Sequence, residues 1–150
     1  MHLRPDLDDV CFIEVGDFTG YALRRGVRRG LRHCLFVGMA GKLAKLAAGV
    51  MMTHWTRSKV DTGLLACLTA EAGGDPALVE SVTAANTARH AYELWTGGGL
   101  GGPGGVCDRL CGQVAANLHR FSGGRLDVEV VLVDFTTLAP VGRGERRAEG

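Results

Sequence analysis

Residues 34–48 read CLFVGMAGKLAKLAA, and this stretch decides the fold class. The first four residues form a continuous apolar run, which is typical of a strand covered on both faces in a parallel sheet. Gly38 and Gly41 follow the run, and the pattern then changes to helical spacing, with Leu43 and Leu46 on one face. The stretch therefore predicts a strand, a tight turn and a helix in succession.

The flanking sequence extends this pattern on both sides. Upstream, residues 10–15 (VCFIEV) predict a strand, and Asp17 can cap a helix that runs to about Arg29. Downstream, residues 127–135 (DVEVVLVDF) give the strongest strand signal in the chain. We predict an α/β fold, with a small and at least partly parallel sheet that helices cover in Rossmann-like layering.

We expect a helix at residues 60–72, and two more helices follow it before the last strand. Asp75 and Pro76 give a good start signal, and we predict a helix from there to about Trp95. Residues 106–121 predict a second helix, with apolar side chains at helical spacing facing inward.

Length and composition are those of an ordinary globular domain. The 150 residues fit one domain, which we place at residues 1–140, and we predict that the charged residues 141–150 form a disordered tail. The formal net charge is +1, so no overall field favours a nucleic-acid partner. Lys42 and Lys45 interrupt the apolar residues 35–52, which argues against a membrane span.

The five cysteines favour a reducing, cytoplasmic location. Their number is odd, and no signal peptide precedes them. Cys107 and Cys111 are spaced i and i+4 on an expected helix, so a bridge or a metal site is an alternative to free thiols. No second Cys/His pair has zinc-type spacing, and we predict no metal.

The first candidate site is the turn that contains Gly38, Gly41 and Lys42. Glycines let a ligand approach the backbone, and the N-terminus of the following helix offers N–H groups and a partial positive charge. Lys42 and Lys45 add full charges, so this turn can hold a carboxylate or a phosphate. The alternative is that the glycines only serve a tight turn.

Three further segments are rich in polar residues. Residues 53–61 (THWTRSKVD) contain His54, a candidate general base, although their composition alone favours a capping and turn segment. Residues 86–90 (NTARH) are predicted to lie mid-helix, as a polar binding face or an ordinary exposed face. Residues 14–20 form a second strand-to-helix turn, and in a parallel sheet this turn would converge with residues 38–42 on one crevice.

The order of these segments resembles the CbiD family. The resemblance rests on residues 37–49 (VGMAGKLAKLAAG), on the Thr53, His54, Arg57, Ser58 and Asp61 positions, on residues 86–90 and on the closing strand. Gly16, Asp17, Phe18 and Gly20 are similar to the turn upstream of these blocks.

This resemblance implies an enzyme of anaerobic cobalamin biosynthesis. Members of the family methylate carbon 1 of cobalt-precorrin-5B with S-adenosyl-L-methionine as the methyl donor. The expected partner is thus a cobalt-containing tetrapyrrole whose carboxylates suit lysine, arginine and helix N-termini. The resemblance covers only the later part of the family sequence, so we expect the chain to be incomplete without an N-terminal half.

The resemblance also implies roles for individual residues. His54 and Asp17 are the expected acid/base residues. Glycines in the two turns would approach the donor: Gly16, Gly20, Gly38 and Gly41. The expected substrate-binding residues are Lys42, Lys45, Thr53, Arg57, Ser58, Asp61, Asn86, Arg89 and His90. The competing hypotheses are a non-catalytic tetrapyrrole- or nucleotide-binding domain and an accessory subunit.

Overall fold

A computed structural model describes residue 6 and residues 18–51 and 61–148 of the chain. Its sheet has three strands in the order β1-β2-β3, where β1 is His33–Gly38, β2 is Asp127–Val133 and β3 is Pro140–Arg146. β1 and β2 are parallel and β2 and β3 are antiparallel, so the sheet is mixed. The prediction of an α/β fold with a partly parallel sheet is confirmed.

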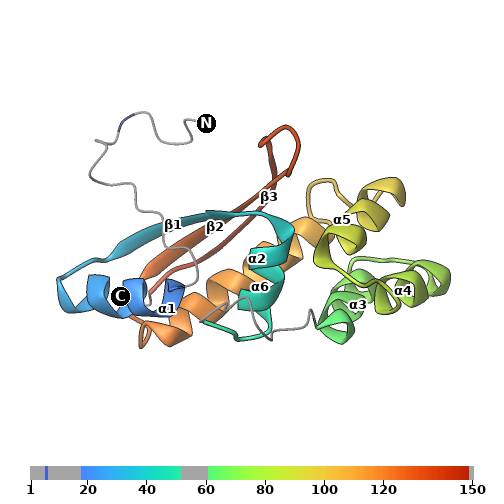
Figure 1. Cartoon of the computed structure of the whole chain (residues 1–150). Coiled ribbons are helices and arrows are strands. Elements are labelled where there is room, and N and C mark those ends of the chain that lie inside the picture. The colour runs from blue at the N-terminus through green and yellow to red at the C-terminus, as the bar shows by residue number, and fades with distance from the viewer. Residues whose placement is uncertain (1–5, 7–17, 52–60, 149–150) are drawn as a thin grey trace.

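Six helices accompany the sheet in the described residues. They are α1 (Thr19–Arg28), α2 (Ala40–Ala47), α3 (Thr62–Glu71), α4 (Pro76–Thr83), α5 (Ala88–Gly97) and α6 (Val106–Phe121). Figure 1 shows α6 running beneath the sheet, with α1 and α2 on the same side of the sheet, and α3, α4 and α5 grouped at one end of the molecule. No helix among the described residues is both long and apolar enough to cross a membrane.

The core lies between the sheet and α6. Leu110, Val114 and Leu118 of α6 are fully buried, as their spacing predicted. They face the same cluster as Val130 and Leu132 of β2. Alternation along β2 accounts for this packing, because every second side chain points to the α6 face.

The strand β1 is less covered than its apolar sequence predicted. Phe36 is buried, but Val37 is 37% exposed, and Leu35 is only partly buried. In the described residues β1 has one strand neighbour, β2, so it lies at an edge. The apolar run therefore identified the strand correctly and its burial incorrectly.

The prediction of a disordered tail was wrong for residues 141–146, which belong to β3. Gly142 and Gly144 lie on the α6 face of β3, where they allow the strand to approach the helix backbone. A Cβ atom on Gly142 would lie 2.8 Å from the carbonyl carbon of Cys107, and one on Gly144 would overlap the backbone of Gly112. The strand is held by close backbone packing, which a charged and glycine-rich sequence does not reveal.

The predicted long helix from Asp75 to Trp95 is also wrong, because it is two helices. Asp75 does cap α4, since its Oδ1 accepts a hydrogen bond from the N–H of Leu78 at 2.8 Å. The chain then leaves helical geometry after Ala84, and Thr87 caps α5 by accepting the N–H of His90 at 3.0 Å. Asn86 and Thr87 thus lie at a helix start and not in mid-helix.

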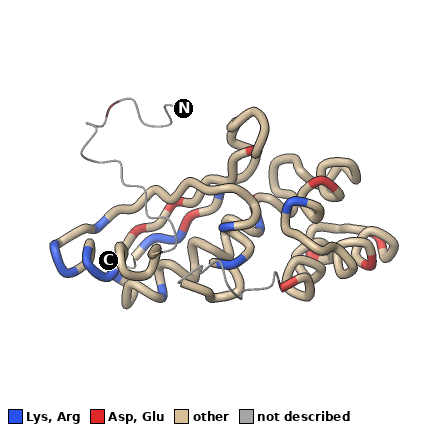
Figure 2. The backbone as a smooth tube through the Cα atoms, viewed as in Figure 1, with Lys and Arg blue, Asp and Glu red and all other residues tan. Residues whose placement is uncertain are grey.

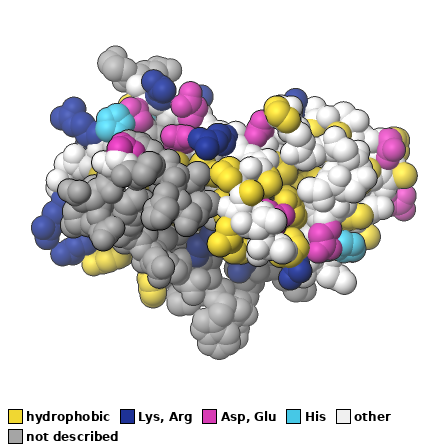
Figure 3. All heavy atoms as spheres, turned by 90° about the horizontal axis from the view of Figure 1, so that it is seen from above, with side chains coloured by type: hydrophobic (Ala, Val, Ile, Leu, Met, Phe, Trp, Pro, Cys, Tyr) yellow, Lys and Arg dark blue, Asp and Glu magenta, His cyan; other side chains and the backbone are white. Residues whose placement is uncertain are grey.

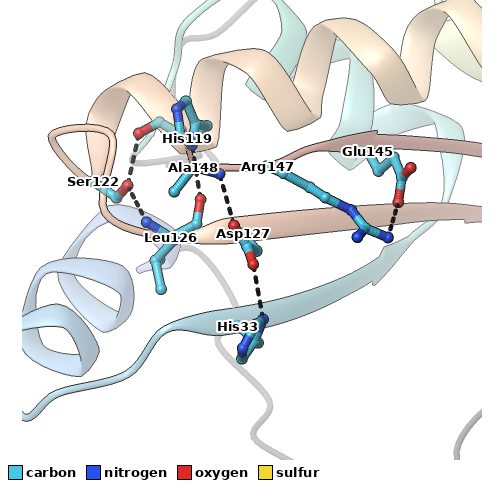
Figure 4. A network of polar contacts seen from close by, with 8 residues as sticks. All are labelled: His33, His119, Ser122, Leu126, Asp127, Glu145, Arg147 and Ala148. Atoms are coloured by element: carbon cyan, nitrogen blue, oxygen red, sulfur yellow. Dashed lines mark hydrogen bonds and ion pairs between the residues drawn. The ribbon is translucent and has the colours of Figure 1, made fainter. Parts of the chain in front are cut away.

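Polar contacts connect the start of β1, the start of β2 and the residues that follow β3 (Figure 4). These contacts lie at the end of the sheet opposite the turn that leads into α2. Asp127 of β2 accepts the N–H of Ala148 at 2.7 Å and lies 3.1 Å from Nδ1 of His33 on β1. Ser122 donates to the carbonyl of His119 at 2.6 Å and accepts the N–H of Leu126 at 3.2 Å. The α6–β2 turn and both neighbours of β2 are fixed at this end.

Candidate functional site

The turn from β1 into α2 has the geometry that the sequence predicted. β1 ends at Gly38, Met39 is the N-cap in extended conformation, and no side chain caps α2. Gly41 is exposed, and a Cβ atom there would have nothing within 4 Å. Open backbone at the start of a helix suits an anion.

The C-terminal end of β2 lies at the same end of the sheet as this turn, and we call this region the carboxyl edge. Gly38 of β1 is paired with Leu132 of β2 in parallel register, and Asp134 follows two residues later. Parallel strands bring their carboxyl ends together, and ligands of open α/β sheets bind at such an edge. Sequence reasoning missed Asp134 as a site residue.

Asp134 is a fixed, ionised carboxylate. Its Oδ1 accepts the backbone N–H groups of Thr136 at 2.8 Å and Thr137 at 2.9 Å, and its Oδ2 accepts the hydroxyl of Tyr92 at 2.7 Å. The N–H of Thr137 and then the Tyr92 hydroxyl lower the pKa of Asp134 from 3.8 to about 2. Burial, followed by the contact with Asp134, raises the pKa of Tyr92 well above its usual value. Asp134 is therefore an orienting group and not a proton donor near neutral pH.

Arg89 of α5 reaches the residue that follows Asp134. Its guanidinium carbon lies 3.7 Å from the centre of the Phe135 ring, and its Nε lies 3.4 Å from Oε1 of Glu93. The ring of Tyr92 meets Phe135 edge-on, with centroids 6.1 Å apart and planes at 77°. This arrangement links α5 to the loop between β2 and β3.

Apolar side chains are exposed around the same edge. Val37 is 37% exposed, Met39 42% and Leu138 44%. In Figure 3, which looks onto the sheet face away from α6, hydrophobic side chains gather in the middle of the molecule beside the helical end. In Figure 2, which has the side view of Figure 1, Lys and Arg positions of α2 and of the start of α5 also lie near the middle of the molecule's length. The edge thus combines apolar surface with cations.

Residues 52–140 match the family model described as "CbiD, C-terminal domain". The chain belongs to the CbiD family.

Curated relatives support this family membership along most of the chain. A cobalt-precorrin-5B C(1)-methyltransferase of Rubrobacter xylanophilus is 61% identical over 95% of the chain, and one of Salinispora arenicola is 62% identical over 89%. A relative of the same name from Leptospira interrogans is 36% identical over 90%. The chain covers 36%, 35% and 36% of these relatives, so it spans about a third of their length. No solved structure matches the chain.

The strand-to-helix turn predicted at residues 14–20, which resembles a turn of the CbiD family, is only partly described. Gly16 and Asp17 lie outside the described residues, as does the predicted strand at residues 10–15. Gly20 is described, and a Cβ atom there would lie 3.0 Å from Cβ of Met51 and from Cζ of Phe121. Helix packing thus gives a reason for glycine at this position, and donor binding by Gly20 stays a prediction.

The polar segment at residues 53–61 is likewise mostly outside the described part. Thr53, His54, Arg57 and Ser58 are not described, so no contact tests their predicted roles. Asp61 is described, and its Oδ1 accepts the N–H of Leu64 at 3.0 Å as the N-cap of α3.

The remaining residues that resemble the CbiD family lie on α2 and around the start of α5. Lys42 and Lys45 lie half-buried on α2, beside the exposed Gly41. Asn86, Arg89 and His90 are all exposed around the start of α5. Tyr92 and Phe135 were not predicted. For Asp134 and Phe135 the sequence offered one signal, the Asp-Phe-Thr-Thr order at residues 134–137, because Asp before such residues often forms a side-chain-to-backbone turn.

Proposed function

We propose that this chain is the C-terminal part of a methyltransferase that acts on carbon 1 of cobalt-precorrin-5B in anaerobic cobalamin biosynthesis. The observation that carries the proposal is the 61% identity, over 95% of the chain, to the Rubrobacter xylanophilus relative of that name. Because the chain spans about a third of such relatives, we expect it to act together with an N-terminal part. Rossmann-like layering of the complete domain and a cytoplasmic location belong to the same proposal; the free thiols of Cys34, Cys67, Cys107 and Cys111 support the latter.

The edge of the sheet suits the proposed substrate. A tetrapyrrole presents a broad apolar body with carboxylates around its rim. Val37, Met39 and Leu138 supply exposed apolar surface. Lys42 and Lys45 follow Met39 on α2, and Arg89 lies over the ring of Phe135, three residues before Leu138. Arginine and lysine are the side chains that bind carboxylates most strongly. We assign Asn86, His90 and the undescribed Thr53, Arg57 and Ser58 to the same substrate as proposals.

The proposed methyl donor is S-adenosyl-L-methionine, whose sulfonium supplies an already activated methyl group. The protein then has to place donor and acceptor in line and exclude competing water. Of the predicted donor-binding glycines that are described, Gly41 offers open backbone, whereas a Cβ atom on Gly38 would lie only 3.3 Å from Cδ2 of Leu43. Gly41 is therefore the position that best fits a donor or a substrate carboxylate. His54 and Asp17 remain the proposed acid/base residues.

A second candidate is an accessory subunit without activity of its own. Phe18 and Tyr21 are 53% and 61% exposed on and beside α1, which leaves aromatic surface for another polypeptide. In this case the site would be completed only across the junction with the N-terminal part.

Calorimetric titration distinguishes these proposals. The chain is titrated with S-adenosylhomocysteine and then with cobyrinic acid, a cobalt corrinoid with free carboxylates. Each titration is repeated with the N-terminal part of the Rubrobacter relative added. Binding by the chain alone assigns that site to this part, and binding only after addition supports a shared site. No binding in any combination by folded protein contradicts the methyltransferase proposal.

Substitution of Lys42 and Lys45 tests the anion turn. The double variant Lys42→Ala, Lys45→Ala should bind cobyrinic acid about tenfold more weakly, a loss of about 1.4 kcal/mol, and should fold normally because half-exposed surface charges contribute little to stability. The matched control is Arg25→Ala with Arg28→Ala, which removes two charges from α1 at one end of the molecule, away from α2 (Figure 2). Equal affinities for wild type and the lysine variant would exclude this turn as the carboxylate site.

A further inference from the structure

Arg89 is held on two of its sides by other side chains. The face of its guanidinium lies on the Phe135 ring, with 3.7 Å between the guanidinium carbon and the ring centre. Its Nε edge faces Glu93, whose Oε1 lies 3.4 Å away and one helical turn further along α5. A stacked guanidinium keeps its N–H donors in the plane, where they can still bind an acceptor.

The Phe135 ring is itself fixed from behind. Tyr92 meets it edge-on at a centroid distance of 6.1 Å, and the Tyr92 hydroxyl donates to Asp134 at 2.7 Å. Asp134 also accepts two backbone N–H groups of the loop that follows it, at 2.8 and 2.9 Å. Tyr92 is 5% exposed, so this support is anchored in the core. The ring therefore has a defined position relative to α5.

The third side of the guanidinium faces outward. Within the described part of the chain, Arg89 makes no hydrogen bond or ion pair other than the one with Glu93, and its side chain is 65% exposed. The two terminal nitrogens, Nη1 and Nη2, form the edge that remains. Two parallel N–H donors on one edge match the two oxygens of a carboxylate.

We propose that Phe135 is a positioning residue that holds Arg89 with its Nη1/Nη2 edge toward a carboxylate of the substrate. This inference rests on the proposed function and deepens it, because it names the substrate group that Arg89 binds and the ring that orients Arg89. Glu93 fixes the rotation of the guanidinium about its stem, and Tyr92 with Asp134 fixes the ring.

Arg143 provides a matched comparison. It lies on β3 with a side chain that is 59% exposed, and its Nη1 lies 3.3 Å from Oε1 of Glu129. Exposure and ion pairing thus resemble those of Arg89. Among the described residues, however, no aromatic ring lies beneath Arg143, so nothing orients its guanidinium from the face.

The test compares four variants of the full 150-residue chain, with the N-terminal part of the Rubrobacter relative present. Cobyrinic acid is the probe, and inorganic phosphate is titrated in parallel to separate a carboxylate site from a general anion site. We expect Arg89→Gln to weaken cobyrinic acid binding about tenfold and Arg143→Gln less than twofold. Phe135→Leu should weaken it about threefold to fivefold, and Phe135→Tyr should keep the affinity of wild type because the ring is retained.

A readout without ligand accompanies the titrations. Protons on the Arg89 side chain lie over the ring, so their NMR signals should be shifted upfield in wild type and Phe135→Tyr but not in Phe135→Leu. Thermal unfolding of each variant shows whether a loss of affinity reflects a loss of folding.

The outcomes distinguish a failure of the positioning role of Phe135 from a failure of the proposed function. If wild type binds cobyrinic acid and Phe135→Leu binds equally well, the positioning role is overturned while the proposed function stands. Equal weakening by Arg143→Gln and Arg89→Gln overturns it too, because the effect is then one of charge alone. If phosphate binds more tightly than cobyrinic acid, the site is a general anion site and the carboxylate assignment is overturned. Absence of binding by wild type overturns the proposed function and this inference with it.

Discussion

The two faces of the sheet differ in how much space they leave for the side chains of β3. On the face toward α6, β3 presents Gly142 and Gly144, and a Cβ atom on Gly142 would lie 2.8 Å from the Cys107 backbone. On the opposite face the same strand carries Arg143, paired with Glu129 at 3.3 Å in an exposed position. The α6 face therefore has no space for added atoms, whereas the outer face accepts long charged side chains.

This difference separates stability from binding. Close packing transmits any added volume into strain, while exposed ion pairs contribute about 0–1 kcal/mol. Substitutions on the α6 face should thus lower the free energy of unfolding, those on the outer face of β3 should change stability little, and those at the carboxyl edge should change ligand affinity.

The largest effect is expected from Gly144→Val. The new side chain would overlap the backbone of Gly112 in α6, so β3 has to move away from the helix. We expect a loss of about 3 kcal/mol or more, measured by urea unfolding. Glu145→Ala, the next position on the opposite face of the strand, is the control and should change stability by less than about 0.5 kcal/mol. Equal stability of both variants would contradict the difference between the faces.

The next largest effect concerns Asn117 of α6. Its amide donates to the carbonyls of Leu46 at 3.0 Å and Ala47 at 2.8 Å, which close the C-terminal end of α2. Asn117→Ala leaves both carbonyls without these donors, and we expect a loss of about 2 kcal/mol. Asn117→Asp keeps the shape but removes the donor, so it should be no more stable than the alanine variant. A stable Asn117→Asp variant would mean that packing, and not hydrogen bonding, matters here.

A smaller and pH-dependent effect is expected at Asp134. The pKa of Asp134 is lowered from 3.8 to about 2 in the folded protein, so its contribution is fully present above pH 4. The contribution is lost as the pH falls from there toward about 2, because the carboxylate becomes protonated. Asp134→Ala should therefore unfold at lower temperature than wild type at pH 7, and the difference should shrink toward pH 2. A difference that does not vary with pH would contradict the lowered pKa.

The smallest effect, of opposite sign, is expected at Gly41 on the carboxyl edge. Gly41 lies in α2 with nothing within 4 Å of a Cβ position. Gly41→Ala should raise the free energy of unfolding by about 0.5–1 kcal/mol, because alanine loses less backbone entropy in a helix. If a ligand approaches this backbone, cobyrinic acid or S-adenosylhomocysteine should bind the variant more weakly. Unchanged affinity for both would remove Gly41 from the site.

Parts of this architecture could be predicted because their signals are local. The apolar run and glycine turn at residues 34–48 gave β1 and α2, and Asp75 with Pro76 gave the start of α4. The spacing of Leu110, Val114 and Leu118 gave the buried face of α6. Each of these signals depends only on neighbouring residues.

The remaining parts depend on distant contacts. β3 lacks alternating apolar residues because glycines form its buried side, so its sequence resembles a loop. The break between α4 and α5 has neither Gly nor Pro, and the Thr87 cap became evident only from its hydrogen bond. The contact between Tyr92 and Asp134 joins residues 42 positions apart, which no local pattern reveals. The acid/base candidates His54 and Asp17 stay predictions.

The pairing of β1 with β2 also has a kinetic consequence. Every helix from α2 to α6 lies between these two strands in the chain, whereas α6, β2 and β3 follow one another directly. Folding slows as contacting residues lie further apart in sequence, because the chain has to close a longer loop. We therefore expect the α6–β2–β3 unit to form first, and β1 to join it in a slower step that Gly144→Val would delay by disrupting the unit on which β1 assembles.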